Sequence, residues 1–223
     1  MFAEAGAKIF RIDSAQIRRH QIREAAAILR SGGVVIYPTE TFYALGAVPV
    51  ISKAVERIYE IKGRDTAKAL PLIASDLQAV FGAAAQWPDP ADRLARIFWP
   101  GPLSLIIPAS TSLSSALHAA TGKIAVRVSS HPVARLLARA CGGLIVSTSA
   151  NMAGGKAPRS PGGIDAGLLA AVDALLDGGN LPGGFPSTIV DVSVYPAVVT
   201  RGGKIGPKEI LRVLAGMRPD RLE

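Results

Sequence analysis

Residues 142–155 read GGLIVSTSANMAGG, and the rest of the predicted fold is arranged around this stretch. The apolar run at residues 144–146 is short and bounded by glycine, which favours a strand buried on both faces over a helix. The polar residues that follow it are Ser147, Thr148, Ser149 and Asn151. Ligands of an open α/β sheet bind in the crevice beyond the carboxyl ends of its strands, so this strand end is a candidate binding site. On composition alone, an ordinary turn rich in hydroxyl groups explains these residues equally well.

A second strand end of the same kind lies earlier in the chain. Residues 34–37 (VVIY) form an apolar run that favours a buried strand, and Pro38 ends its hydrogen-bond ladder. The sequence TETFYALG follows at residues 39–46 and carries the hydroxyl groups of Thr39 and Thr41. An apolar strand therefore ends in polar side chains here as well.

The remaining chain alternates between helical and extended patterns, which indicates an α/β fold. Helices are expected from about residue 14 to residue 31, over residues 51–61, 77–84, 91–98, 132–140 and 164–176, and from Pro207 onward. Strands are expected over residues 69–74, 103–107, 124–128, 189–192 and 197–200. Asp13 or Ser14 is expected to cap the first helix, and Ser52 the second. We expect the last two strands to pair as an antiparallel ribbon.

Composition narrows the class of protein. A chain of 223 residues, 49% hydrophobic and 19% charged, can bury one large core, so we expect a single domain. It has no apolar run of about 20 residues, and residues 1–10 lack an apolar block, so neither a membrane span nor a signal peptide is expected. The single cysteine, Cys141, favours a cytoplasmic protein. The net charge of +8 and the isoelectric point near 10.0 favour anionic partners such as nucleotides or RNA.

Basic residues gather in the loop before the expected strand at residues 69–74. Lys62, Arg64 and Lys68 surround a glycine, and such a loop can hold phosphate. The simpler alternative is a basic helix end that interacts with its own dipole. Arg127 stands in the middle of another expected strand, where an apolar pattern does not require a charge. It is expected either to be paired in the interior or to point at a ligand.

Several standard catalytic signatures are absent from the sequence. It has neither the phosphate-binding loop GxxxxGK[ST], nor the dinucleotide fingerprint GxGxxG, nor the nucleophile elbow GxSxG. The histidines His20, His118 and His131 are too scattered to form a zinc site with one cysteine. We interpret Cys141 as a buried core residue rather than as a nucleophile paired with His131. Magnesium that accompanies a nucleotide is the one metal expected.

Two short motifs together resemble the signature of a known family. Lys62-x-Arg64 and Ser149-x-Asn151 resemble the KxR and SxN motifs of YrdC-like threonylcarbamoyl-AMP synthases. The further segments that resemble this family, in its order, are PTETFYALG at 38–46, PGP at 100–102, Arg127, HP at 131–132, STIVD at 187–191 and Arg201-x-Gly203. Each motif is weak alone, but the ordered set covers roughly residues 15–205 and is specific. The chain differs at Ala44, where the family commonly has glycine.

The resemblance implies an α/β fold in which a twisted mixed sheet, flanked by helices, surrounds a large basic concave cavity. The same fold occurs in dihydroxybutanone-phosphate synthase. It implies one YrdC-like domain over residues 1–223, with its core at about residues 15–205 and a C-terminal helix and short tail after residue 206. Some members carry an extra C-terminal domain, and this chain resembles the short form.

The resemblance also implies a reaction, in which L-threonine, bicarbonate and ATP give threonylcarbamoyl-AMP and pyrophosphate. Downstream threonylcarbamoyl-transferase proteins would use this product to modify tRNA. The residues carried over as catalytic are Lys62, Arg64, Ser149 and Asn151. Those expected around ATP are Arg64, Lys68, Ser149, Asn151 and Arg201. Those expected around threonine are Thr39, Thr41, Arg127, Ser147 and Ser187. ATP enters as a substrate with Mg²⁺, and no protein-ligated metal is implied.

Hydroxyl groups and cations suffice for this chemistry. The amine of threonine captures carbon dioxide as a carbamate, whose oxygen attacks the α-phosphorus of ATP while pyrophosphate leaves. Such a transfer depends on positioning and on neutralising phosphate charge, so no enzyme nucleophile is needed. We expect Lys62 and Arg64 to stabilise the transition state. We also expect a loop, at residues 110–115 or 156–163, to close over the adenylate and exclude water.

Two other functions stay open on the sequence. The basic surface could hold tRNA or double-stranded RNA without catalysis, through phosphate contacts. The chain could instead adenylate carbamoyl phosphate, as a domain of hydrogenase-maturation proteins does, although it lacks the cysteine pairs of their zinc fingers. ATP consumption that requires threonine distinguishes the synthase from the RNA-binding module. A requirement for carbamoyl phosphate would instead indicate the adenylation of that compound.

Overall fold

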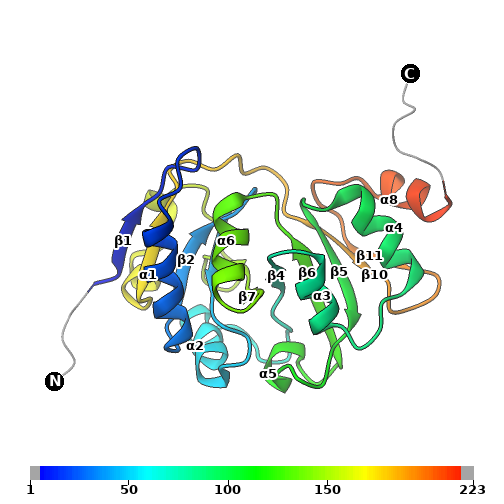
Figure 1. Ribbon diagram of the computed structural model, residues 1–223, viewed down its shortest axis with the longest axis horizontal. Helices are drawn as coiled ribbons and strands as arrows, with labels where there is room; N and C mark the ends of the chain where they lie inside the picture. Colours follow the sequence, from blue (N-terminus) through cyan, green and yellow to red (C-terminus); the bar gives the residue numbers. More distant parts are fainter. Residues whose placement is uncertain (1–5, 217–223) are drawn as a thin grey trace.

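Two mixed β-sheets form the framework of the computed structural model, which describes residues 6–216 (Figure 1). The five-stranded sheet has the order β1 (Lys8–Arg11), β9 (Ala174–Asp177), β2 (Val35–Pro38), β3 (Tyr43–Gly46) and β8 (Thr148–Ser149). The six-stranded sheet has the order β11 (Val198–Arg201), β10 (Thr188–Asp191), β5 (Leu103–Pro108), β6 (Lys123–Val128), β4 (Leu72–Ala74) and β7 (Leu144–Val146). Both sheets contain parallel and antiparallel pairs, so the predicted α/β class with mixed strand pairing is confirmed.

Helices flank these sheets. They are α1 (Arg19–Arg30), α2 (Ser52–Lys62), α3 (Leu77–Ala83), α4 (Asp89–Phe98), α5 (Ser115–His118), α6 (Pro132–Ala140), α7 (Ala166–Ala170) and α8 (Pro207–Leu214), with a 3₁₀ turn, η1 (Pro161–Gly163). Figure 1 shows α1, α6 and α3 along the same face of the molecule. None of the helices formed by residues 6–216 has the length and apolar character needed to cross a lipid bilayer.

The inner strands β2, β3 and β4 bury both of their faces. In β2, Val35 and Tyr37 belong to a hydrophobic cluster with α1 and α6, whereas Ile36 belongs to a larger cluster on the other side. Alternate residues of a strand point to opposite faces, so a strand between two apolar layers needs a continuous apolar run. This explains why residues 34–37 show no polar alternation, and it confirms the strand predicted there.

The helix predicted over residues 164–176 is confirmed only at residues 166–170, and its C-terminal part is wrong. Only α7 is helical, capped by Asp165, whose Oδ1 accepts the Leu168 amide at 2.9 Å, and the chain then forms β9. Asp173 marks the change, since its Oδ2 accepts the Val34 amide at 2.7 Å. Leu175 and Leu176 then face opposite clusters, as strand neighbours do. The leucines of this segment have a helical spacing, but pairing of β9 with β1 and β2 overrides that local preference.

The predicted first residues and caps of the helices agree less well with the structure than the predicted positions of the helices. Helix α1 begins at Arg19 with no side-chain cap, and Asp13 instead accepts the Ala15 amide at 2.8 Å in a turn before it. Ser52 is the first residue of α2 rather than its cap. Strand β1 was not predicted at all, because its four residues pair with β9 far along the sequence.

The C-terminal part follows the prediction. Strands β10 and β11 pair as the expected antiparallel ribbon, with Val190 opposite Val199. The expected last helix begins at Pro207 as α8. The tail at residues 217–223 and the first five residues lie outside the described part of the chain.

Candidate active site

A cavity of about 470 Å³ is lined by residues of both sheets and of the loops that follow their strands. Eight of the eleven predicted site residues line it: Thr39, Thr41, Arg64, Arg127, Ser147, Ser149, Ser187 and Arg201. The three that do not are Lys62, Lys68 and Asn151. The segments quoted from residues 34–46 and 142–155 therefore meet in space, since β3 pairs with β8 and places Ala44 opposite Ser149.

Arg127 is held in the cavity wall by a buried acid. It lies on β6, and its Nε donates to Oε1 of Glu40 at 3.1 Å, with both side chains almost fully buried. The Ser129 hydroxyl donates to the other carboxylate oxygen. Burial alone would raise the pKa of Glu40, but the charge of Arg127 and the Ser129 hydroxyl outweigh it and lower that pKa. Arg127 is therefore paired in the interior, and it also lines the cavity.

A second arginine reaches the cavity from the ribbon. The guanidinium of Arg201, on β11, donates to the carbonyl oxygen of Ser187 at 2.8 Å and to its Oγ at 3.0 Å. The Ser187 hydroxyl in turn lies 3.2 Å from the Ser104 hydroxyl of β5. Burial, followed by the nearby charge of Arg127, lowers the pKa of Arg201. The repulsion between these two cations favours occupation of the cavity by an anion.

The basic loop contributes the third arginine. Gly63 ends α2 in the left-handed region, at a φ of 55°, and turns the chain so that Arg64 lines the cavity. The Arg64 side chain donates to the carbonyl oxygens of Lys68 at 3.2 Å and Ala69 at 3.0 Å. Lys68 is exposed and lies outside the lining residues.

Lys62 lies beneath the SxN segment rather than in the cavity wall. Its ammonium is buried and donates to the carbonyl oxygens of Ser149 and Asn151, each at 2.5 Å. Burial, together with the charge of Arg64, lowers the pKa of Lys62 to about 8. The side-chain Nδ2 of Asn151 donates to the carbonyl oxygens of Met152 and Gly155 at 2.7 and 2.8 Å. Lys62 and Asn151 therefore shape the segment that carries Ser149.

Hydroxyl groups complete the wall between the arginines. Thr39 Oγ1 accepts the amide of Phe42 at 3.3 Å and donates to its carbonyl oxygen at 2.7 Å, which closes the turn after β2. Thr41 Oγ1 lies 3.3 Å from Thr39 Oγ1. The Ser147 hydroxyl is buried and has no partner among the described residues. A buried hydroxyl group that lines a cavity without a protein partner is available to a ligand.

Three arginines line this cavity, and none of its described lining residues is acidic. Sequence reasoning missed three supporting residues, Glu40, Ser104 and Ser129. Glu40 lies inside the quoted TETFYALG segment, but its partner Arg127 is far away in the sequence, so only the fold reveals the pair. Among residues 6–216, no three His, Cys, Asp or Glu residues gather as potential metal ligands. The arrangement can bind a small polar anion with guanidinium, hydroxyl and backbone groups.

The fold and cavity define a class: a mixed α/β protein with a cavity lined by arginine and hydroxyl side chains. The chain belongs to the Sua5/YciO/YrdC family, whose model, described as "Telomere recombination", matches residues 27–203. It is 33% identical over 203 residues to the threonylcarbamoyl-AMP synthase of Pyrococcus abyssi. That alignment covers 91% of this chain and 60% of that protein, so the chain spans less than two thirds of the relative's length.

Solved structures agree with the family. The structure of P. abyssi Sua5 complexed with L-threonine matches with a TM-score of 0.87 and 32% identity, covering 94% of this chain and 62% of that one. The crystal structure of Escherichia coli YciO matches with a TM-score of 0.83 and 30% identity, covering 92% of this chain and 98% of that one. The expected family fold is therefore confirmed.

Proposed function

We propose that this chain is a threonylcarbamoyl-AMP synthase, which condenses L-threonine, bicarbonate and ATP to threonylcarbamoyl-AMP and pyrophosphate. The observation that carries the proposal is the convergence of Arg64, Arg127 and Arg201 with several hydroxyl groups, including the unpartnered one of Ser147, in one cavity. The similarity to a synthase from P. abyssi and to a threonine complex of Sua5 supports this substrate class. The product would serve downstream proteins that modify tRNA, a cytoplasmic process compatible with one buried cysteine.

The threonine end of the cavity is proposed around Arg127. Its guanidinium can bind the carboxylate of threonine, while Glu40 and Ser129 keep it in place. The unpartnered Ser147 hydroxyl, with Thr39, Thr41 and Ser187, can bind the amine and hydroxyl groups of threonine. The Ala44 methyl group lines the same cavity, where the family commonly has glycine.

The nucleotide end is proposed around Arg64, Ser149 and Arg201. Arg64 and Arg201 can neutralise the phosphate oxygens as the carbamate oxygen attacks the α-phosphorus and pyrophosphate leaves. Mg²⁺ enters with ATP as part of the substrate. We assign Lys62 and Asn151 a positioning role, because both hold the Ser149 segment through backbone carbonyl oxygens. This replaces the expectation that Lys62 itself stabilises the transition state.

The test is pyrophosphate release by the purified chain given ATP, Mg²⁺ and bicarbonate, with L-threonine, with serine or with no amino acid. We expect release that requires both bicarbonate and threonine. Arg127→Gln removes a charge-assisted bond worth about 1.5–3 kcal/mol, so the KM for threonine should rise roughly 10- to 150-fold. Arg19→Gln, which removes an equal charge from an exposed position on α1, serves as the matched control and should behave as wild type.

Three outcomes would count against the synthase. Release that is independent of threonine would contradict the substrate assignment. Release that requires carbamoyl phosphate would favour the adenylation of that compound instead. No release, combined with salt-sensitive binding of double-stranded RNA, would favour the binding module.

A further inference from the structure

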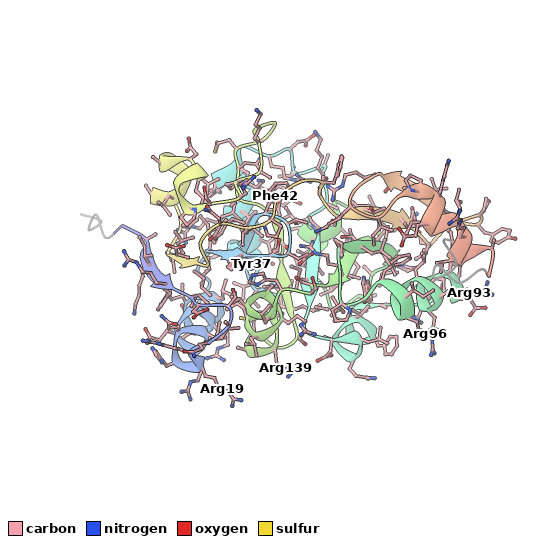
Figure 2. The ribbon with its side chains drawn as sticks, turned by 90° about the horizontal axis from the view of Figure 1, so that it is seen from above. Arg19, Tyr37, Phe42, Arg93, Arg96 and Arg139 are labelled. Carbon is pink, nitrogen blue, oxygen red and sulfur yellow. The ribbon has the colours of Figure 1, made fainter. Side chains whose placement is uncertain are left out.

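A second cavity, of about 310 Å³, lies where β4 and β6 end and is enclosed by α3, α4 and α6. Its lining residues are Ser75, Asp76, Leu77, Ala95, Arg96, Trp99, Pro100, Val128, Arg135 and Arg139. None of them lines the first cavity. Figure 2 shows Arg19, Arg139 and Arg96 along one side of the molecule and Phe42, which lines the first cavity, toward the other.

The charge of this second cavity is unbalanced. Its lining includes three guanidinium groups, those of Arg96, Arg135 and Arg139, and one carboxylate, that of Asp76. Asp76 caps α3, where its Oδ1 accepts the Ala79 amide at 3.0 Å, and its Oδ2 lies 3.4 Å from the Arg139 guanidinium. Arg96 is paired with Asp92, outside the lining, at 2.6 Å, so among residues 6–216 Arg135 is the one of these three cations without an acidic partner. Its uncompensated charge in a concave site attracts an added anion.

Of these three cations, Arg135 is the one whose hydrogen-bonding capacity is least used. Its Nε is buried and has no hydrogen-bond partner among residues 6–216. Arg135 and Arg139 are four positions apart on α6, so they lie on one helix face, and like charges at this spacing destabilise a helix. A buried donor without a partner and a repulsive pair facing one cavity are both explained if a bound anion completes them.

Apart from Ser75, the rest of the wall is apolar. The indole Nε1 of Trp99 donates to the carbonyl oxygen of Leu103 at 2.7 Å, which fixes the ring in place. Pro100, Leu77, Ala95 and Val128 add apolar surface. Inorganic phosphate would leave this surface unused, and a nucleic-acid backbone would contact the exposed arginines of this side without filling the cavity.

We propose that the second cavity binds a small organic anion, with a carboxylate or phosphate head against Arg135 and Arg139 and an apolar or aromatic body against Trp99. The site is separate from the proposed synthase reaction. It differs from the first cavity in the tryptophan of its wall, which favours ligands that carry both an anionic head and an apolar or aromatic part.

The chain offers a local reporter for this site. It has two tryptophans, Trp99 in the cavity wall and Trp87, whose ring centroid lies 6.1 Å from that of Trp99. Titration of the full chain with phenyl phosphate, benzoate and inorganic phosphate, followed by tryptophan fluorescence, therefore reports on the second cavity. We expect a saturable change with phenyl phosphate or benzoate, and binding of inorganic phosphate at least tenfold weaker. The comparison of the two aromatic probes identifies the preferred head group.

Variants separate this site from other anion-binding surfaces. Arg135→Gln should weaken binding of the preferred probe about tenfold or more, because it removes a charge-assisted hydrogen bond. Arg139→Gln, at an exposed side chain, provides a second test if Arg135→Gln lowers the melting temperature. Arg93→Gln removes an equal charge from α4 outside the cavity, and Arg201→Gln removes one from the first cavity; both should leave the affinity within twofold. The proposal fails if neither aromatic probe gives a saturable change, if inorganic phosphate binds equally well, or if Arg201→Gln rather than Arg135→Gln abolishes the signal.

Discussion

Replacing Glu40 by glutamine tests the electrostatic support of the candidate active site. The Glu40→Gln variant keeps the shape of the side chain and an oxygen that can accept from Ser129, but it removes the charge that balances Arg127. The exposed fractions of the Arg127 and Glu40 side chains are 7% and 10%, so solvent screens the pair little. The guanidinium would then remain buried without a counter-charge.

The separation of the two groups sets the size of the effect. At the 3.1 Å between Arg127 Nε and Glu40 Oε1, an effective dielectric constant of about 20 gives an attraction of roughly 5 kcal/mol. Removing one partner of a buried pair typically costs about 3–5 kcal/mol. In a chain of this size, that loss corresponds to a fall in melting temperature of roughly 6–20 °C. Since the pKa of Glu40 is lowered in the folded state, the stabilising effect is present above the ordinary carboxyl range and is lost as pH falls through the folded-state pKa.

Urea denaturation of four proteins gives the coupling energy directly: wild type, Glu40→Gln, Arg127→Met and the double variant. We expect each single variant to lose about 3–5 kcal/mol of unfolding free energy at neutral pH, and the double variant to lose much less than the sum. Arg19→Gln controls for the loss of an exposed charge. Single losses below about 1 kcal/mol, or losses that simply add, would refute the reasoning that each charge needs the other.

Two further predictions concern buried titratable groups. Because the pKa of Lys62 falls to about 8 on folding, the unfolded chain binds more protons between that pH and its ordinary value. The difference in unfolding free energy between wild type and Lys62→Met should therefore rise by roughly 1 kcal/mol per pH unit from pH 8 to pH 10. The same difference at both pH values would contradict this prediction. Burial also raises the pKa of the Cys141 thiol to about 11, so its alkylation by iodoacetamide at pH 7.5 should be roughly 300-fold slower than that of a free cysteine. Labelling at the rate of the urea-unfolded chain would show that this thiol is accessible and ionised.

Apolar runs bounded by glycine or proline were enough to predict two strands of the framework. Residues 34–37 and 144–146 are such runs, and the structure contains β2 and β7 there. The hydrophobic pattern failed as a predictor at residues 164–176, where a helical spacing and a strand occupy the same segment. Leu168, Leu169, Val172, Leu175 and Leu176 satisfy a helical spacing. The last two nevertheless belong to β9, because pairing with β1 and β2 outweighs local preference.

The sequence predicted which residues belong to the candidate site better than it predicted the role of each residue. Motif resemblance identified residues that the fold brings to one cavity, including Arg64, Arg127 and Ser149. It did not distinguish a cavity-lining side chain from a supporting one: Lys62 belongs to the same motif as Arg64 but donates to backbone carbonyl oxygens beneath Ser149. The partnership of Glu40 with Arg127 depends on how β6 packs against the turn after β2, and no local pattern in the sequence records it.

The position of β9 also determines when the five-stranded sheet can form during protein synthesis. β9 lies between β1 and β2, and its Ala174 pairs with both Lys8 and Val35. The strand at the start of the chain therefore has no neighbour until residues 174–177 have left the ribosome, and β2, with all four residues buried in the finished fold, keeps one edge open for as long. Contacts so distant in sequence form slowly, and an unpaired apolar strand is a site of aggregation. The emerging chain should therefore need protection at β2 until residues 174–177 can pair with it.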